Sequence, residues 1–138
     1  MIDYVALTLR GESLDPSEVT SQLGVKPSRS FARGDVTVHP TPTTFGYWRL
    51  RIDGPHGELN GYLSELLDCF AGRELELAHA AENLEATITM VADLAGDEGE
   101  LTISSSLLAR IAAINTQLRL YWIHEPSSSD SAATQDQP

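Results

Sequence analysis

The chain has 138 residues, of which 41% are hydrophobic, and it carries a formal net charge of −11 at pH 7. This length suits one domain that buries a single core, and it leaves no room for a second. The acidic balance argues against binding to double-stranded nucleic acid, because neutralising phosphates requires a cationic surface.

Targeting signals and disulfides are not predicted. No stretch approaches the ~20 consecutive apolar residues of a membrane span, and the N-terminus lacks the apolar region of a signal peptide. The single cysteine, Cys69, excludes an internal disulfide, and its apolar neighbours Leu66 and Phe70 favour an inert thiol in the core over a nucleophile. We therefore expect a cytoplasmic protein that does not bind membranes.

The first two predicted elements are a strand and a short helix. Apolar and other residues alternate over residues 3–10, which is typical of a half-buried strand. The helix that follows begins with Asp15 as N-cap and Pro16 at its first position, and Glu18 completes a capping box. Gly24 then ends it.

A second strand is expected over residues 47–53, after a loop at 36–45 that contains two prolines. An amphipathic helix is expected over residues 55–72. Its apolar stripe has helical spacing and comprises Leu59, Tyr62, Leu63, Leu66, Leu67 and Phe70.

The remaining predicted elements are a short helix over residues 75–81, a strand over 85–94, and a helix with a serine N-cap that ends near Asn115. A last strand contains Leu118, Leu120 and Trp122. Residues 126–138 are almost free of apolar side chains and are expected to be a disordered tail, so that residues 1–125 form the single domain.

A weak internal repeat suggests how these elements combine. A strand, a glycine-containing loop, an N-cap and a helix occur at residues 9–23 and again at 94–114, each followed by a strand with a tryptophan. We expect an α+β, ferredoxin-like (split βαβ) fold, in which an antiparallel four-stranded sheet carries two repeat helices and the helix at 55–72 is an insertion. An α+β sheet with another strand order is the alternative. The predicted core includes Val19, Leu23, Trp48, Leu63, Leu66, Leu67, Ile88, Leu108, Ile111 and Trp122.

This arrangement places polar and aromatic side chains together on the second sheet face. They are Tyr4, Arg10, Tyr47, Arg49, Arg51, Arg119 and Tyr121. Tyrosine and arginine on an open sheet face are typical of RNA-recognition folds and of protein interfaces. The sequence leaves open whether this face is exposed or covered by the helix at 55–72.

Several short motifs in the first third of the chain resemble those of a known family. They are Leu14-Asp15-Pro16, Leu23-Gly24-Val25, Pro27-Ser28 and Gly34-Asp35, followed by Trp48 on the next strand. The chain resembles the bacterial domain-of-unknown-function family DUF4279 over roughly residues 3–123. The resemblance implies a small α+β protein with no established reaction, in a family where some members are suspected immunity proteins. The last strand departs from it, because residues 117–121 lack the acidic residue expected there.

Positive charge is concentrated in one segment. Five of the nine Lys and Arg residues lie between residues 26 and 51, where Asp35 is the only acid, so this segment has a net charge of +4 and the remainder −15. These candidate anion- or partner-binding residues are Lys26, Arg29, Arg33, Arg49 and Arg51. They either hold an anion or are neutralised by acidic neighbours such as Asp15, Glu18 and Asp35.

Catalytic and metal-binding signatures are not found. The four histidines occur in separate elements without ligand spacing, and there is no nucleophile elbow, phosphate loop or dinucleotide fingerprint. We expect a protein that is not an enzyme and needs no cofactor or metal. Two hypotheses remain: a binding module whose acidic surface holds a cationic protein partner, in the manner of an immunity protein, or a small-anion or nucleotide-binding domain that holds a phosphate-bearing small ligand through the basic segment at residues 26–51.

Overall fold

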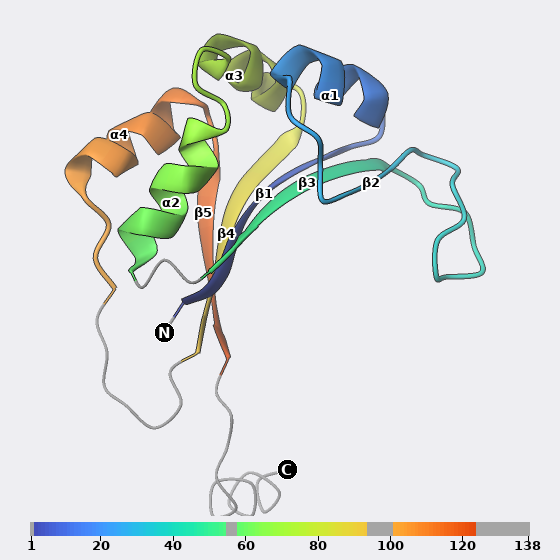
Figure 1. Ribbon diagram of the computed structural model, residues 1–138. Coiled ribbons are helices and arrows are strands. Elements are labelled where there is room, and N and C mark those ends of the chain that lie inside the picture. The colour runs from blue at the N-terminus through green and yellow to red at the C-terminus, as the bar shows by residue number, and fades with distance from the viewer. Residues whose placement is uncertain (1, 55–57, 94–100, 124–138) are drawn as a thin grey trace, which may run out of the picture.

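The computed structural model describes residues 2–54, 58–93 and 101–123. Figure 1 shows a strongly curved sheet with helices along one side. In chain order the elements are β1 (Ile2–Gly11), α1 (Pro16–Leu23), β2 (Arg29–Phe31), β3 (Gly46–Asp53), α2 (Leu59–Asp68), α3 (Glu74–Glu82), β4 (Glu85–Asp93), α4 (Ser105–Ala113) and β5 (Gln117–Ile123).

The fold is α+β, as expected, but its sheet is not the expected one. The described strands form a five-stranded sheet in the order β2-β3-β1-β4-β5. β1 pairs antiparallel with both β3 and β4, whereas β4 and β5 are parallel. The four-stranded antiparallel ferredoxin-like plan is therefore not confirmed.

The two halves of the apparent repeat explain this difference. After α4 the chain returns parallel to β4, which makes a strand–helix–strand crossover between neighbouring strands. After α1 the chain instead passes through the short strand β2 and a long loop, and then returns as β3 antiparallel to β1. Similar local sequence patterns thus lead to different strand directions.

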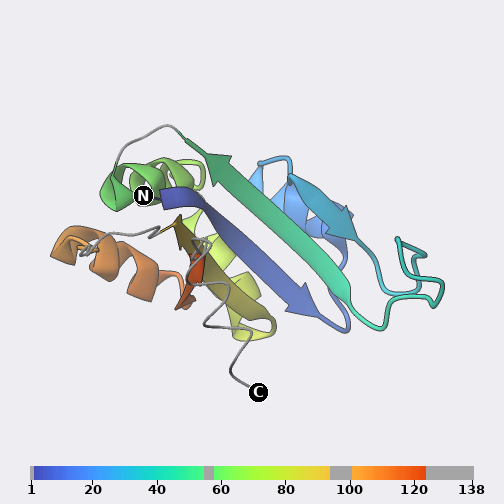
Figure 2. The same cartoon turned by 90° about the horizontal axis from the view of Figure 1, so that it is seen from below.

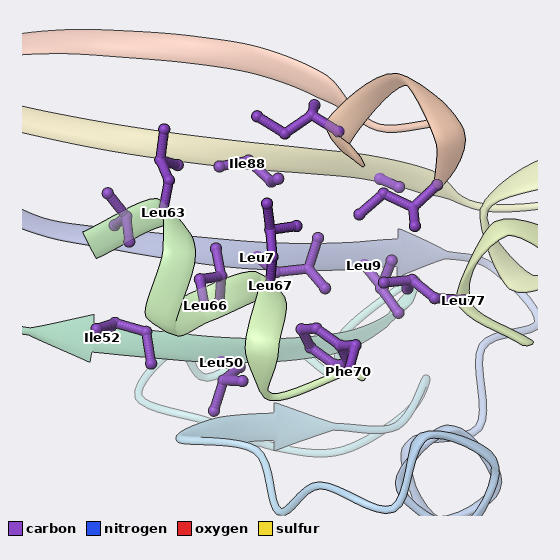
Figure 3. Close-up of a cluster of buried hydrophobic side chains, with 14 of the residues drawn as sticks. Leu7, Leu9, Leu50, Ile52, Leu63, Leu66, Leu67, Phe70, Leu77 and Ile88 are labelled. Carbon is purple, nitrogen blue, oxygen red and sulfur yellow. The ribbon is translucent and has the colours of Figure 1, made fainter. Parts of the chain in front are cut away.

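The core lies between one face of the sheet and the helices. Figure 3 shows α2 lying over β1 and β3, with Leu66 and Leu67 directed at Leu7. Leu7 and Leu66 are 1% and 0% exposed, so this contact is fully shielded from water. The helix predicted over residues 55–72 is thus present as α2, which begins at Leu59, while residues 55–57 lie outside the described part.

The local signals around α1 act as the sequence predicts. The Asp15 carboxylate accepts a hydrogen bond from the Ser17 amide at 3.0 Å, and Gly24 has the left-handed conformation, with φ 68°. Glu18 differs from the expected capping box, because its carboxylate accepts a hydrogen bond from the Gln22 side-chain amide at 3.3 Å. The buried Trp48 indole donates to Thr20 Oγ1 at 3.0 Å and so ties α1 to β3.

Two side chains that were expected in the core are exposed, and a third lies outside the described part. Leu108 is 45% exposed instead of buried, because α4 directs Leu107 and Ile111 to the core and turns Leu108 outward. Cys69 is exposed instead of a core residue, because at this C-cap of α2 the buried positions are taken by Leu66, Leu67 and Phe70. The side chain of Trp122 lies outside the described part.

Candidate functional site

The face of the sheet opposite the helices presents side chains from all five strands. Figure 2 views this face, with the strands in front of the helices. No described helix covers it, since α2 packs on β1 and β3 from the other side. Within the described residues, α2 therefore leaves the face with the tyrosines and arginines uncovered, a point that the sequence left open. We call this surface the open face.

Strand register sets the open-face residues in rows that run across the sheet. One row joins Arg29, Arg49 and Thr8, because Arg29 is paired with Arg49 and Arg49 with Thr8. A second row runs from Arg51 through Ala6 and Thr89 to Arg119. Five of the nine cationic residues of the chain therefore share one face: Arg10, Arg29, Arg49, Arg51 and Arg119.

Aromatic rings support several of these guanidinium groups. The Arg51 guanidinium carbon lies 3.8 Å from the centre of the Tyr4 ring, and that of Arg49 lies 5.2 Å from the same ring. Arg10 lies 3.9 Å from the ring centre of Phe45. Such contacts hold a guanidinium in place while leaving N–H groups at its edge for an external acceptor.

Most of these arginines have no carboxylate partner within the described residues. Among the described residues, only Arg51 of this group forms an ion pair, with its Nε 2.7 Å from the Asp53 carboxylate, and both side chains are substantially exposed. Two of the three acids expected to neutralise the basic segment are engaged with backbone amides: Asp15 with Ser17, and Asp35 with Ala32 at 2.9 Å. The third, Glu18, interacts with the Gln22 side chain.

The structure places the five predicted site residues in three locations. Arg29, Arg49 and Arg51 lie together on the open face. Lys26 lies outside the strands, in a hollow of about 490 Å³ beside α1 whose lining includes Arg29 together with Ser17 and Thr20. Arg33 is exposed in the turn that follows β2. The basic segment is therefore not one convergent site.

Two further residues join the open-face group although the site prediction did not include them. Arg10 comes from β1, outside the basic segment, and the alternation of its strand places it on the open face beside Tyr47. Phe45 is in the proline-containing loop, and it reaches Phe31 at a ring-centre distance of 5.6 Å. Strand alternation was the sequence signal for Arg10, whereas no periodic signal marked Phe45.

A pocket of about 510 Å³ opens where β1, β2 and β3 meet this loop. Arg10 and Arg29 contribute positive charge to its lining, and Phe31, Phe45 and Tyr47 contribute aromatic rings. The rings of Phe31 and Tyr47 are stacked, with centres 5.0 Å apart and planes at 9°. The pocket therefore combines cationic groups with an ordered aromatic wall.

Chemistry other than binding has little support in the described residues. Within residues 2–54, 58–93 and 101–123, no three His, Cys, Asp or Glu side chains lie close enough together to hold a metal ion. Partial burial raises the pKa of the Cys69 thiol, and the negative charges of Glu65 and Asp68 raise it further. A raised pKa lowers the thiolate fraction at neutral pH, which makes this exposed cysteine a weak nucleophile.

The helices of the described part are short. None of those in the described part is both long enough and apolar enough to cross a bilayer.

The fold and the site define a small α+β domain with an arginine- and aromatic-rich sheet face. The sequence profile of the family described as Domain of unknown function (DUF4279) matches residues 2–123, and the chain belongs to this family. No curated protein and no solved structure shows significant similarity to the chain.

Proposed function

We propose that the protein is a non-catalytic binding module and that the open face is the surface that holds a protein partner. The observation that carries the proposal is the set of four open-face arginines without an ion pair in the described residues of an acidic chain. Unpaired guanidinium groups beside exposed rings contribute little to folding, whereas arginine and tyrosine dominate the energetics of protein interfaces.

Charge complementarity indicates which partner surface suits the open face. Arg29 and Arg49 lie directly opposite each other in the β2–β3 pair, so their like charges repel unless an anion lies between or above them. A partner that presents Asp or Glu side chains would remove this repulsion and form charge-assisted hydrogen bonds. The proposed partner is therefore a protein with an acidic contact surface.

A second candidate places the partner on the helices. The outer surface formed by α1 and α3, which pack together, carries the exposed acids Glu18, Glu74, Glu76 and Glu82. This surface suits the cationic partner expected from the net charge, and it corresponds to an immunity-type inhibitor. Both candidates keep the cytoplasmic setting, which the single cysteine supports.

A matched pair of variants separates the two candidates. The open-face variant is Arg29→Gln with Arg49→Gln, and the helix variant is Glu74→Gln with Glu76→Gln, so each removes two charges; Arg49 is half-buried and the other three residues are exposed. Each protein is used as bait in a native lysate, captured proteins are identified by mass spectrometry, and their affinities are then measured by titration with purified partner. We expect a partner that binds the parent and the helix variant, and that binds the open-face variant at least about tenfold more weakly.

The opposite pattern would contradict the open-face proposal. A partner that is lost from the helix variant and kept by the open-face variant would assign the interface to α1 and α3. Equal binding of one purified partner to all three proteins would exclude both surfaces.

A further inference from the structure

The pocket between the sheet and the loop is more specific than the open face around it. Its volume of about 510 Å³ falls in the range of ~300–1,000 Å³ that is usual for small-molecule sites. Among the described residues that line it, none is acidic. The nearest acid by register is Glu85, which lies opposite Arg10 in the β1–β4 pair, yet Arg10 lies over Phe45.

The loop that forms one wall of the pocket is anchored by its own hydrogen bonds. The Gly34 amide donates to the Thr43 carbonyl at 2.9 Å, and the Thr43 hydroxyl donates to the Ala32 carbonyl at 2.8 Å. The Asp35 carboxylate caps the Ala32 amide at 2.9 Å. Because these bonds fix the loop in the absence of a ligand, little conformational entropy is lost when a ligand enters.

The groups in the pocket favour a ligand that is both anionic and flat. Arg10 and Arg29 come from different strands and both reach the pocket lining, where guanidinium groups match the oxygen geometry of phosphate. The stacked pair of Phe31 and Tyr47, with Phe45 beside it, offers an apolar aromatic surface of the kind on which nucleobases stack. The Thr37 hydroxyl adds a hydrogen-bonding group on the loop side.

We propose that this pocket binds a nucleoside monophosphate, with the phosphate at Arg10 and Arg29 and the base against the aromatic wall. The anchored loop closes one side of the pocket, which favours a single nucleotide over a continuing strand. This inference does not depend on the protein partner, because it is argued from the lining of the pocket alone, although Arg10 and Arg29 also belong to the open face.

The test is a calorimetric titration of the full chain with AMP and UMP, beside adenosine, uridine and inorganic phosphate. We expect each monophosphate to bind at least about tenfold more tightly than its nucleoside and than phosphate, since two charge-assisted contacts and one stacking surface act together. In a two-dimensional NMR spectrum of labelled protein, the largest shifts should occur at the amides of Gly34, Thr43 and Phe31.

Variants on one sheet face provide the controls. Arg10→Gln and, separately, Arg29→Gln should each weaken the monophosphate by about tenfold or more. Arg119→Gln removes the same charge from the same face outside the pocket, and it should leave the affinity unchanged. Glu85→Gln removes the nearest competing carboxylate and should tighten binding. The two pocket variants occur on different strands, so a folding defect in one still leaves the other as a test.

Three results would overturn the inference. The first is that neither monophosphate binds at millimolar concentration. The second is that inorganic phosphate binds as tightly as the monophosphates. The third is that an oligonucleotide of eight nucleotides binds much more tightly than the monophosphate. The last result would assign the open face to single-stranded nucleic acid. Failure of this titration leaves the lysate experiment untouched, since that experiment measures a different ligand and the Arg29/Arg49 pair.

Discussion

The two faces of the sheet are built from the same strands but meet different surroundings. On β3, Leu50 is buried beneath the helices, while its neighbours Arg49 and Arg51 belong to the open face. On β1, Leu9 is 0% exposed and the next residue, Arg10, is exposed. On one face apolar side chains pack against each other, and on the other four of the five arginines have no ion pair in the described chain. The comparison indicates that stability comes from the first face and recognition from the second.

The largest expected effect is at the helix-covered face. Leu66→Ala should lower the free energy of unfolding by about 2–5 kcal/mol, because the side chain is fully buried against the sheet and its removal leaves a cavity. Chemical denaturation measures this change. Leu108→Ala is the matched control on α4, where exposure should keep the cost much smaller. Similar losses in both variants would contradict the division between buried and exposed leucines.

A second large effect is expected where β3 begins. Gly46 is buried, and a methyl group there would overlap with the carbonyl oxygen of Leu14, in the segment that leads into α1. Gly46→Ala should therefore cost about 1–3 kcal/mol as an overpacking change. Ser13→Ala, at an exposed position near Leu14, is the control. If Gly46→Ala were as stable as the parent, the close approach of these two segments would be wrong.

Strand and helix periods predicted most of the elements, but not their arrangement. Alternation at Val5, Leu7 and Leu9 correctly assigned the faces of β1, and the Asp15 cap and a serine cap, which the structure shows to be Ser104, correctly placed two helices. β2 was missed because three residues are too few to show a period of two. Strand order depends on long-range pairing, which local patterns do not encode, so the repeat suggested a topology that the structure does not have.

The candidate site was predicted only in part, for a similar reason. Clustering along the sequence suggested one site from residue 26 to residue 51, whereas residues on one face of a strand belong together in space. Arg29, Arg49 and Arg51 belong to the basic segment and also lie on the open face. Lys26 and Arg33 belong to the basic segment but do not lie on the open face, whereas Arg10 lies on the open face but outside the basic segment. Which arginines lie together depends on the cross-strand register, and that register is known only from the three-dimensional structure.

The open face should respond to mutation in the opposite way to the core. Arg29→Gln with Arg49→Gln should change the free energy of unfolding by less than about 1 kcal/mol, because neither residue forms an ion pair in the described chain. Removing the repulsion between them favours a small gain in stability. Thermal unfolding measures the change. A loss as large as that of Leu66→Ala would show that these arginines serve the fold.

The smallest effect is expected at the C-terminal end. Deleting residues 126–138, which lie outside the described part, should leave the melting temperature within experimental error, because their composition offers almost no apolar surface to bury. Calorimetry of the two proteins provides the comparison. A drop of several degrees would show that this segment contributes to the domain.

The central claim is that the open face, and not the helix-covered side, is the binding surface. The most direct measurement is NMR mapping of labelled protein with a partner identified by capture, following the arginine Nε–H and aromatic ring signals together with the backbone amides. The account predicts that the largest changes occur at Arg29, Arg49 and Tyr4 on the open face, while the amides of α1 and α3 stay in place. Changes concentrated at Glu18, Glu74 and Glu76, with the open-face signals unmoved, would contradict it.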